Sequence, residues 1–201
     1  MPTSPRPRSI ALRIELLDVV PGVWRRVLVS NQSTLAGLHN YLQWVLGWMD
    51  THAHEFQVGD GVVAPDWWID EVGLDSDTSN YRDERRVSVA TIAKELGTGG
   101  EFVYRYDMGD GWRHRIVIEP PPSHCADIEV PLPTCLAGEN ACPPDDVGGP
   151  HGYAQFLDIL GNREHEQHED MVRWIGGVFD PKGFDLNRLN REWRGAKKRK
   201  P

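Results

Sequence analysis

Apolar and polar residues alternate over residues 10–16, and this period of two predicts a strand with one buried face. The inward side chains would be those of Ile10, Leu12, Ile14 and Leu16. Pro21 and Gly22 then supply a turn, and residues 24–29 are predicted to be the second strand of a hairpin.

A helix is predicted to follow this hairpin. Between Leu35 and Leu46 the apolar residues recur at spacings of three and four, with Ser33 or Thr34 as the cap and Gly47 as the stop. Residues 52–58 are expected to form a third strand. The order of hairpin, helix and strand predicts an α+β fold with a β-grasp-like opening.

The second half of the chain is more irregular in its pattern. Residues 64–86 are acidic and poorly periodic, so we expect a long irregular segment there, and residues 87–96 could form a short helix that ends at Gly97. Residues 102–106 and 112–118 both alternate and are joined by the turn Met108-Gly-Asp-Gly111, which predicts a second antiparallel hairpin.

Eight of the fifteen prolines lie in residues 120–150, so this segment is expected to be extended and mostly irregular. Residues 153–160 and 164–174 are predicted to be C-terminal helices, with a third helix possible over residues 184–193.

Composition indicates one folded unit. A chain of 201 residues, 39% of them hydrophobic, can bury one core. We predict a flexible N-terminus over residues 1–9, a single domain over residues 10–194 and a basic flexible tail over residues 195–201. Residues 44–49 form the longest apolar stretch, far short of the roughly 18 residues that cross a bilayer, and residues 1–9 lack an apolar signal core. The protein is therefore expected to be soluble and cytoplasmic, without membrane contact.

Charge is distributed unevenly along the chain. The net charge is −8, yet residues 191–200 hold six basic residues and one acidic residue. Because an acidic body repels phosphates, any contact with nucleic acid would come from this end, with Lys197, Lys198, Arg199 and Lys200 as the candidates. A solvated tail is the alternative.

Several unusual strings follow one another in a fixed order. They are Pro21-Gly-Val-Trp-Arg-Arg26, Thr34-Leu-x-x-Leu-His39, Gly47-Trp48, His52-x-His54-x-Phe56, Tyr104-x-Tyr-Asp-Met-Gly-Asp-Gly-Trp-x-His114 and Cys135-x-x-Gly-x-x-x-Cys-Pro-Pro-Asp-Asp-x-Gly-Gly-x-x-Gly-Tyr153. Together these strings resemble the plasmid pRiA4b open-reading-frame-three-like family over roughly residues 10–190. The resemblance implies an α+β domain associated with plasmids and mobile elements; some members are labelled transposon passenger or resolvase-like proteins. Met108 and Asp145 depart from the Phe and Glu that are usual in the family, and the second departure shortens a carboxylate.

His52 and His54 are two residues apart on a predicted strand, so both imidazoles could bind one metal ion or substrate. The alternative is a histidine packed or hydrogen-bonded near Trp48 and Phe56, because Phe56 has the same parity.

The second hairpin offers catalytic candidates in Asp107, Asp110 and His114, as an acid–base pair or as metal ligands. Aspartates beside a tight turn also commonly cap backbone N–H groups. Trp112 is a candidate for binding. Three arginines on the opposite face of the hairpin could bind an anion or could balance the negative charge of the rest of the domain: Arg105, Arg113 and Arg115.

Cys135 and Cys142 are candidate zinc ligands, with His124, Cys125 or His151 to complete the set. Three cysteines without an export signal favour a reducing compartment, although free thiols or a Cys135–Cys142 disulfide are alternatives. Asp145 and Asp146 could be acid–base or ligand carboxylates, or could cap the following helix.

No Walker loop, nucleophile elbow or dinucleotide fingerprint is present, so the sequence does not support common nucleotide enzymology. Two other functions are consistent with the patterns described above. The first is a non-enzymatic binding or accessory domain that contacts a protein or nucleic acid partner. The second is a metal-dependent hydrolase in which a divalent ion, such as zinc, is held in a His/Asp pocket. We expect at least two of three segments, namely the His52 strand, the Asp107 hairpin and the cysteine loop, to line one concave pocket with Trp112 at its rim. The alternative is that each motif caps its own turn.

Overall fold

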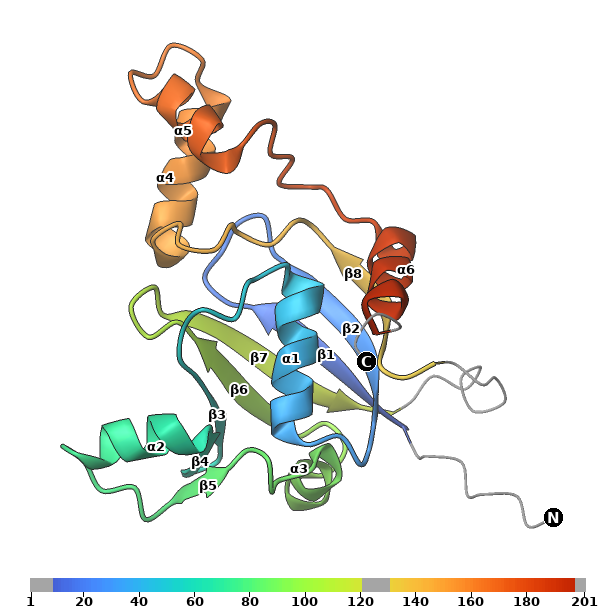
Figure 1. Cartoon of the computed structure of the whole chain (residues 1–201). Helices are drawn as coiled ribbons and strands as arrows, with labels where there is room; N and C mark the ends of the chain where they lie inside the picture. The colour runs from blue at the N-terminus through green and yellow to red at the C-terminus, as the bar shows by residue number, and fades with distance from the viewer. Residues whose placement is uncertain (1–8, 121–130, 198–201) are drawn as a thin grey trace.

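The computed structural model describes residues 9–120 and 131–197, which form one mixed β-sheet with helices packed around it (Figure 1). The strands are β1 Ser9–Leu16, β2 Trp24–Ser30, β3 His54–Val58, β4 Gly61–Ala64, β5 Tyr81–Asp83, β6 Glu101–Tyr106, β7 Trp112–Glu119 and β8 Thr134–Glu139. The helices are α1 Leu35–Leu46, α2 Asp66–Gly73, α3 Val89–Leu96, α4 Gly149–Gly161, α5 His168–Ile175 and α6 Leu186–Lys197. The strand order is β5-β4-β3-β6-β7-β1-β2-β8, antiparallel throughout except for the parallel pair β4–β5. The α+β class is confirmed.

Helix α1 lies against one face of the sheet (Figure 1). Thr34 accepts the N–H of Gly37 and caps the helix, and Gly47 ends it in the left-handed region at φ 81°. The apolar face of α1 is fully buried, and its burial contributes roughly 1.5–3 kcal/mol for each large side chain. The same buried face carries two polar residues, His39 and Gln43, one turn apart.

The β-grasp-like opening is not confirmed. After α1, strand β3 pairs with β4 and β6, whereas β1 pairs with β2 and β7. The second hairpin forms as predicted, with Tyr104 opposite His114 and Tyr106 opposite Trp112. It inserts between the opening hairpin and β3, and thereby places His54 directly opposite Tyr106.

Three predicted irregular or helical segments differ from the structure. Residues 64–86 contain α2, which starts after Pro65, and the short edge strand β5; α2 buries no residue fully, which explains its weak periodicity. The proline-rich segment contains β8, which pairs with β2. Helix α5 begins only at His168, because Asn162 accepts the N–H of Glu164 in a preceding turn.

Helix α6 extends to Lys197 and therefore runs three residues into the tail that was predicted to be flexible. Its Trp193 packs against Tyr41 and Trp44 of α1, with ring centroids 4.9 and 5.5 Å apart. None of the helices in the described ranges is long and apolar enough to cross a membrane.

Candidate metal-binding pocket

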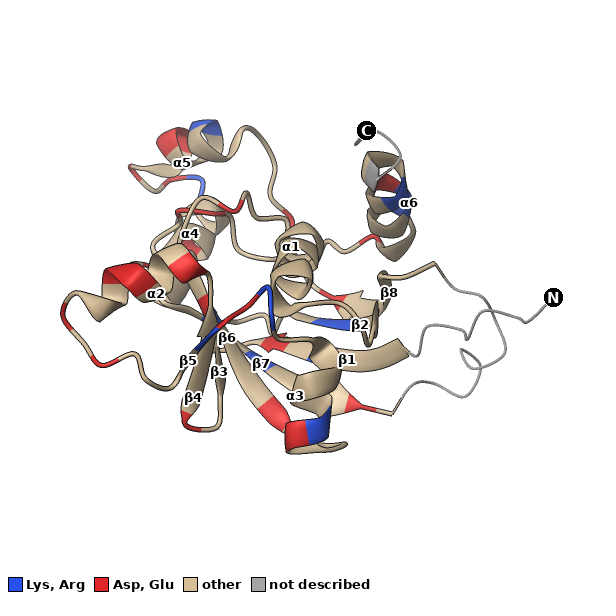
Figure 2. Ribbon diagram, turned by 60° about the horizontal axis from the view of Figure 1, so that its bottom comes forward, with Lys and Arg blue, Asp and Glu red and all other residues tan. Residues whose placement is uncertain are grey.

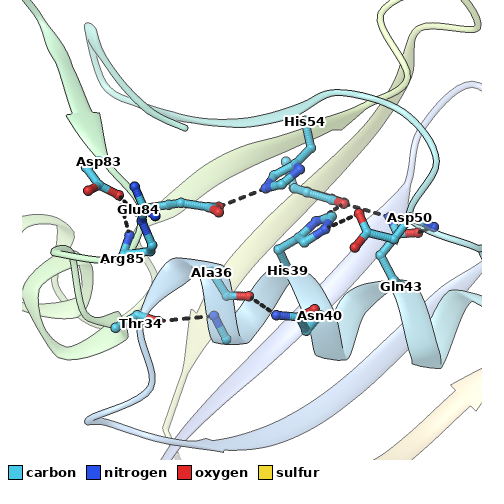
Figure 3. Close-up of polar contacts among 12 residues, drawn as sticks. Thr34, Ala36, His39, Asn40, Gln43, Asp50, His54, Asp83, Glu84 and Arg85 are labelled. Carbon is cyan, nitrogen blue, oxygen red and sulfur yellow. Dashed lines mark hydrogen bonds and ion pairs between the residues drawn. The ribbon is translucent and has the colours of Figure 1, made fainter. Parts of the chain in front are cut away.

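Two imidazoles lie face to face beside the sheet. His39 comes from α1 and His54 from the first position of β3; their ring centroids are 3.4 Å apart and their planes differ by 3° (Figure 3). Each ring contacts a carboxylate through its Nε2 atom. His39 Nε2 is 2.7 Å from Asp50 Oδ1, and His54 Nε2 is 2.8 Å from Glu84 Oε2.

A hydrogen-bonded network fixes the orientation of His39. Gln43 donates from Nε2 to the Tyr104 hydroxyl at 2.9 Å, and this hydroxyl lies 2.8 Å from His39 Nδ1. Gln43 Oε1 also accepts the backbone N–H of Asp50. Because Tyr104 occupies Nδ1, the Nε2 atom faces Asp50, and Tyr104 and Gln43 hold both groups in place.

Burial and the neighbouring His54 together lower the pKa of His39 to about 4, against the opposing effect of Asp50. The ring is therefore neutral near pH 7. A neutral imidazole is the form that binds metal ions.

The arrangement can hold one metal ion. Ligand atoms of His39, Asp50 and His54 all lie within 4.8 Å of one another. Two imidazoles and a carboxylate suit zinc and other first-row transition metals, and three protein ligands leave a coordination position open. These residues line a pocket of about 380 Å³ together with Glu84, His52 and Trp67.

A second cluster lies beside the first. His52 Nε2 is 2.7 Å from Asp146 Oδ1 and 3.6 Å from Asp107 Oδ2, and Asp145 also contributes a ligand atom within 4.8 Å of those of His52 and Asp146. Burial lowers the pKa of His52, but the hydrogen bond to Asp146 and the charges of the three aspartates outweigh it, so the pKa lies above its ordinary value.

The structure brings together the three segments that were expected to converge, since His52, Asp107 and the Asp145–Asp146 loop meet. His52 and His54 belong to two different clusters of potential ligand atoms. His52 precedes β3, where the strand parity does not apply, and its ring turns to Asp146 while His54 turns to Glu84.

Two candidates from the hairpin are buried rather than accessible. Trp112 is 0% exposed and packs beside Trp48, so the prediction that it forms the rim of a binding site is wrong. His114 is also 0% exposed; burial lowers its pKa to about 3 against the hydrogen bond to the Tyr104 carbonyl. The inward parity of β7 places both side chains in the core, where they cannot reach a solvent-borne substrate.

Asp110 and Asp107 both serve the backbone of the hairpin turn and its surroundings. Asp110 Oδ2 accepts the N–H of Gly148, and Asp107 Oδ1 accepts the N–H groups of Gly109 and Asp110. Asp110 thus makes the backbone contact expected from the capping alternative, while Asp107 keeps Oδ2 directed toward His52.

The three arginines of the hairpin are paired with carboxylates, which favours the alternative that they balance nearby acidic residues. Arg105 contacts Glu55, Arg113 contacts Asp18, and Arg115 contacts Glu101 and Glu15. Their positive charges are balanced by nearby acidic residues on the outer face of the sheet. Of the basic C-terminal candidates, Lys197 ends α6, whereas Lys198, Arg199 and Lys200 lie outside the described residues.

Cys135 and Cys142 are free thiols, and within residues 9–120 and 131–197 neither belongs to a cluster of three potential metal ligands. Burial raises the pKa of each to about 11 despite the nearby Arg25, which keeps both protonated. His124 and Cys125, proposed to complete a zinc site, lie outside the described residues, and His151 contacts Gln155 instead.

Sequence reasoning missed His39, Asp50 and Glu84. The signal for His39 was present, because His39 and Gln43 are polar residues spaced by one turn on the apolar face of α1. Asp50 and Glu84 lie in connections with no spacing motif, and only the tertiary fold brings Glu84 to His54.

The molecule is thus an α+β domain with a histidine–carboxylate pocket beside a mixed sheet. The chain belongs to the family of plasmid pRiA4b ORF-3-like proteins, whose model matches residues 8–188. It is 34% identical over 187 residues to the uncharacterised protein y4hQ of Sinorhizobium fredii, covering 90% of this chain and 89% of that protein. It is also similar to the crystal structure of MM3350, a protein of unknown function from Methanosarcina mazei Go1, with a TM-score of 0.73, 29% identity and coverage of 90% and 96% of the two chains.

Proposed function

We propose that this chain is a metal-dependent protein that holds a divalent transition-metal ion through His39, Asp50 and His54. The observation that carries the proposal is the convergence of three ligand atoms within 4.8 Å from α1, the following loop and β3. The donor set of two imidazole nitrogens and one carboxylate favours Zn²⁺ among the common divalent ions.

The charge balance around the imidazoles supports a bound cation. Within the described ranges Asp50 and Glu84 form ion pairs only with His39 and His54, and no Lys or Arg contacts either carboxylate. The alternative is a pair of ordinary His–carboxylate hydrogen bonds. That alternative explains each hydrogen bond separately. It gives no reason why the His39 and His54 rings are stacked in parallel where both residues line a pocket.

Metal-dependent hydrolysis is the reaction that the pocket suits best. Its volume of about 380 Å³ falls in the range of small-ligand sites. A bound ion lowers the pKa of its water. Glu84 lines the same pocket, with its carboxylate 2.8 Å from His54 Nε2, and is the residue that we propose to accept a proton from that water.

The test is metal content and affinity of the untagged full-length chain. We expect close to one equivalent of Zn²⁺ by elemental analysis. For His39→Gln we expect a Kd by calorimetry that is at least 100-fold weaker, because losing a metal ligand costs more than the roughly 10–100-fold effect of losing a residue that only hydrogen-bonds to a ligand. His151→Gln is the matched control, since His151 is exposed on α4 and outside the pocket. A folded wild-type chain that binds no Zn²⁺, or a His39→Gln variant with unchanged affinity, refutes the proposal.

The hydrolase assignment has its own test. Zn²⁺-loaded protein should release p-nitrophenol from at least one of a set of p-nitrophenyl esters and phosphate esters, and His39→Gln should abolish the release while His151→Gln retains it. Metal binding without any such activity would leave a metal-binding domain and reject the hydrolase.

A further inference from the structure

The second cluster is independent of the first in its residues. His52 lies just before β3, Asp107 lies at the β6–β7 turn, and Asp145 and Asp146 lie in the loop that leads to α4. Contacts of 2.7 Å to Asp146 and 3.6 Å to Asp107 bring these three segments together at the His52 ring.

The cluster holds more negative charge than its partners can balance. Three carboxylates surround one imidazole, and in the described part of the chain no Lys or Arg forms an ion pair with Asp107, Asp145 or Asp146. The side chain of Asp107 is 10% exposed. An ordinary His52–Asp146 ion pair accounts for only one of the three charges.

Asp145 carries an unsatisfied acceptor within this cluster. Its Oδ2 accepts the N–H of Met49 at 3.1 Å and lies 3.4 Å from the Tyr106 hydroxyl, whereas its Oδ1 is buried and has no partner. A buried carboxylate oxygen without a partner is costly, and buried polar atoms of this kind are normally satisfied by a donor, a water or an ion.

We infer that His52, Asp145 and Asp146, with Asp107 beside them, form a second divalent-cation site that fastens the loop before α4 to the sheet. The donors are mainly carboxylate oxygens with one imidazole. Mn²⁺ prefers ligand sets rich in oxygen, whereas the His39–His54 pocket is richer in nitrogen. We therefore assign Mn²⁺ to this cluster.

The site has a structural consequence. Helices α4 and α5 project away from the sheet (Figure 1), and the Asp145–Asp146 loop leads directly into α4. A cation shared between this loop, His52 and the β6–β7 turn would join the base of that projection to the body of the domain.

The experiment separates this site from the first one. Mn²⁺ is titrated into full-length His39→Gln protein, which lacks a ligand of the first site, and binding is followed by calorimetry and by the loss of the free Mn²⁺ electron paramagnetic resonance signal. We expect about one equivalent of bound Mn²⁺, a Kd at least 10-fold weaker when Asp146→Asn or Asp145→Asn is added, and no change for Asp158→Asn, an exposed aspartate on α4.

A second readout keeps the inference testable if one variant folds poorly. Mn²⁺ should raise the melting temperature of the His39→Gln protein and slow its cleavage by protease in residues 143–149, and these effects should be absent in either cluster variant that remains folded. The second site is overturned, and the first site left untouched, if the His39→Gln protein binds no Mn²⁺ or if both cluster variants bind Mn²⁺ as tightly as the His39→Gln protein without them. Loss of Zn²⁺ binding by His39→Gln with retained Mn²⁺ binding supports both sites.

Discussion

Burial and charge divide the histidines of this domain into chemically different groups. His39 and His114 are held neutral because burial lowers their pKa values to about 4 and about 3. The pKa of His52 is raised because three aspartates outweigh its partial burial. One residue type thus occurs as a buried neutral ring in the pocket, as a core side chain and as the partner of several carboxylates.

The buried His114 predicts how stability depends on pH. An unfolded chain protonates this histidine near pH 6.5, whereas the folded state resists protonation until about pH 3. The unfolded state therefore binds more protons between these values, and the free energy of unfolding falls with acidification by up to about 1.4 kcal/mol per pH unit from this group. The His114→Phe variant should lose this part of the slope in urea unfolding between pH 7 and pH 5.

The control for that experiment is His151→Gln, whose exposed imidazole should leave the slope unchanged. An identical slope in wild-type and His114→Phe protein would show that His114 becomes protonated in the folded state, contrary to its complete burial.

Local pattern predicted most helices and strands because their apolar faces follow a simple period. The opening hairpin, α1, the Tyr104–His114 hairpin and α4 all bury one regular face, as α1 does with Leu38 and Leu42. Segments that bury little escaped prediction, such as α2, where no residue is fully buried, and β5, with three residues at the sheet edge. The pairing of β3 with β6 depends on contacts distant in sequence, which periodicity does not encode.

The same distinction applies to the site. His52 and Asp107 could be predicted because each lies in a distinctive string, and the structure brings them within 3.6 Å. Glu84 meets His54 only after a 30-residue excursion, so no local spacing identifies it.

The start of α4 makes a close contact that only glycine permits. Gly149 has φ 69°, and a Cβ there would clash with the carbonyl oxygen of Asp110. Gly149→Ala should therefore lower the free energy of unfolding by about 2–5 kcal/mol, the combined cost of a left-handed alanine and an overpacked contact. Chemical denaturation measures the change.

Gly161→Ala provides the comparison within the same helix, because a Cβ at Gly161 meets nothing within 4 Å and its φ is not positive. We expect this variant to be as stable as wild type or slightly more stable. Equal behaviour of the two variants would mean that the loop before α4 can move away from Asp110 at little cost, which would also weaken the case for a fixed Asp145–Asp146 site.

Positive and negative charges are paired with each other in some parts of the molecule and separated in others. Arginines on the outer face of the sheet are matched by carboxylates, as for Arg105 and Glu55. In the described part of the chain, Asp50, Asp146 and Glu84 form their ion pairs with imidazoles. Acidic residues also gather on α2, whereas basic residues mark α6 (Figure 2). On this separation rest the proposals that the C-terminal end contacts a polyanion and that the pocket binds a cation.

The hypothesis of a nucleic acid partner therefore depends on the C-terminal basic residues. A variant that ends at Lys197 keeps α6 intact and removes Lys198, Arg199 and Lys200, whereas a cut at Gly195 would shorten the helix. If these three side chains contact phosphates, the slope of log K against log salt for duplex DNA should become shallower by about 2.7, at about 0.9 for each lost contact. Fluorescence anisotropy from 25 to about 200 mM salt covers the range in which such electrostatic binding weakens. Equal slopes for the two proteins would exclude these residues from DNA contact, and a protein partner would then be the remaining form of the binding hypothesis.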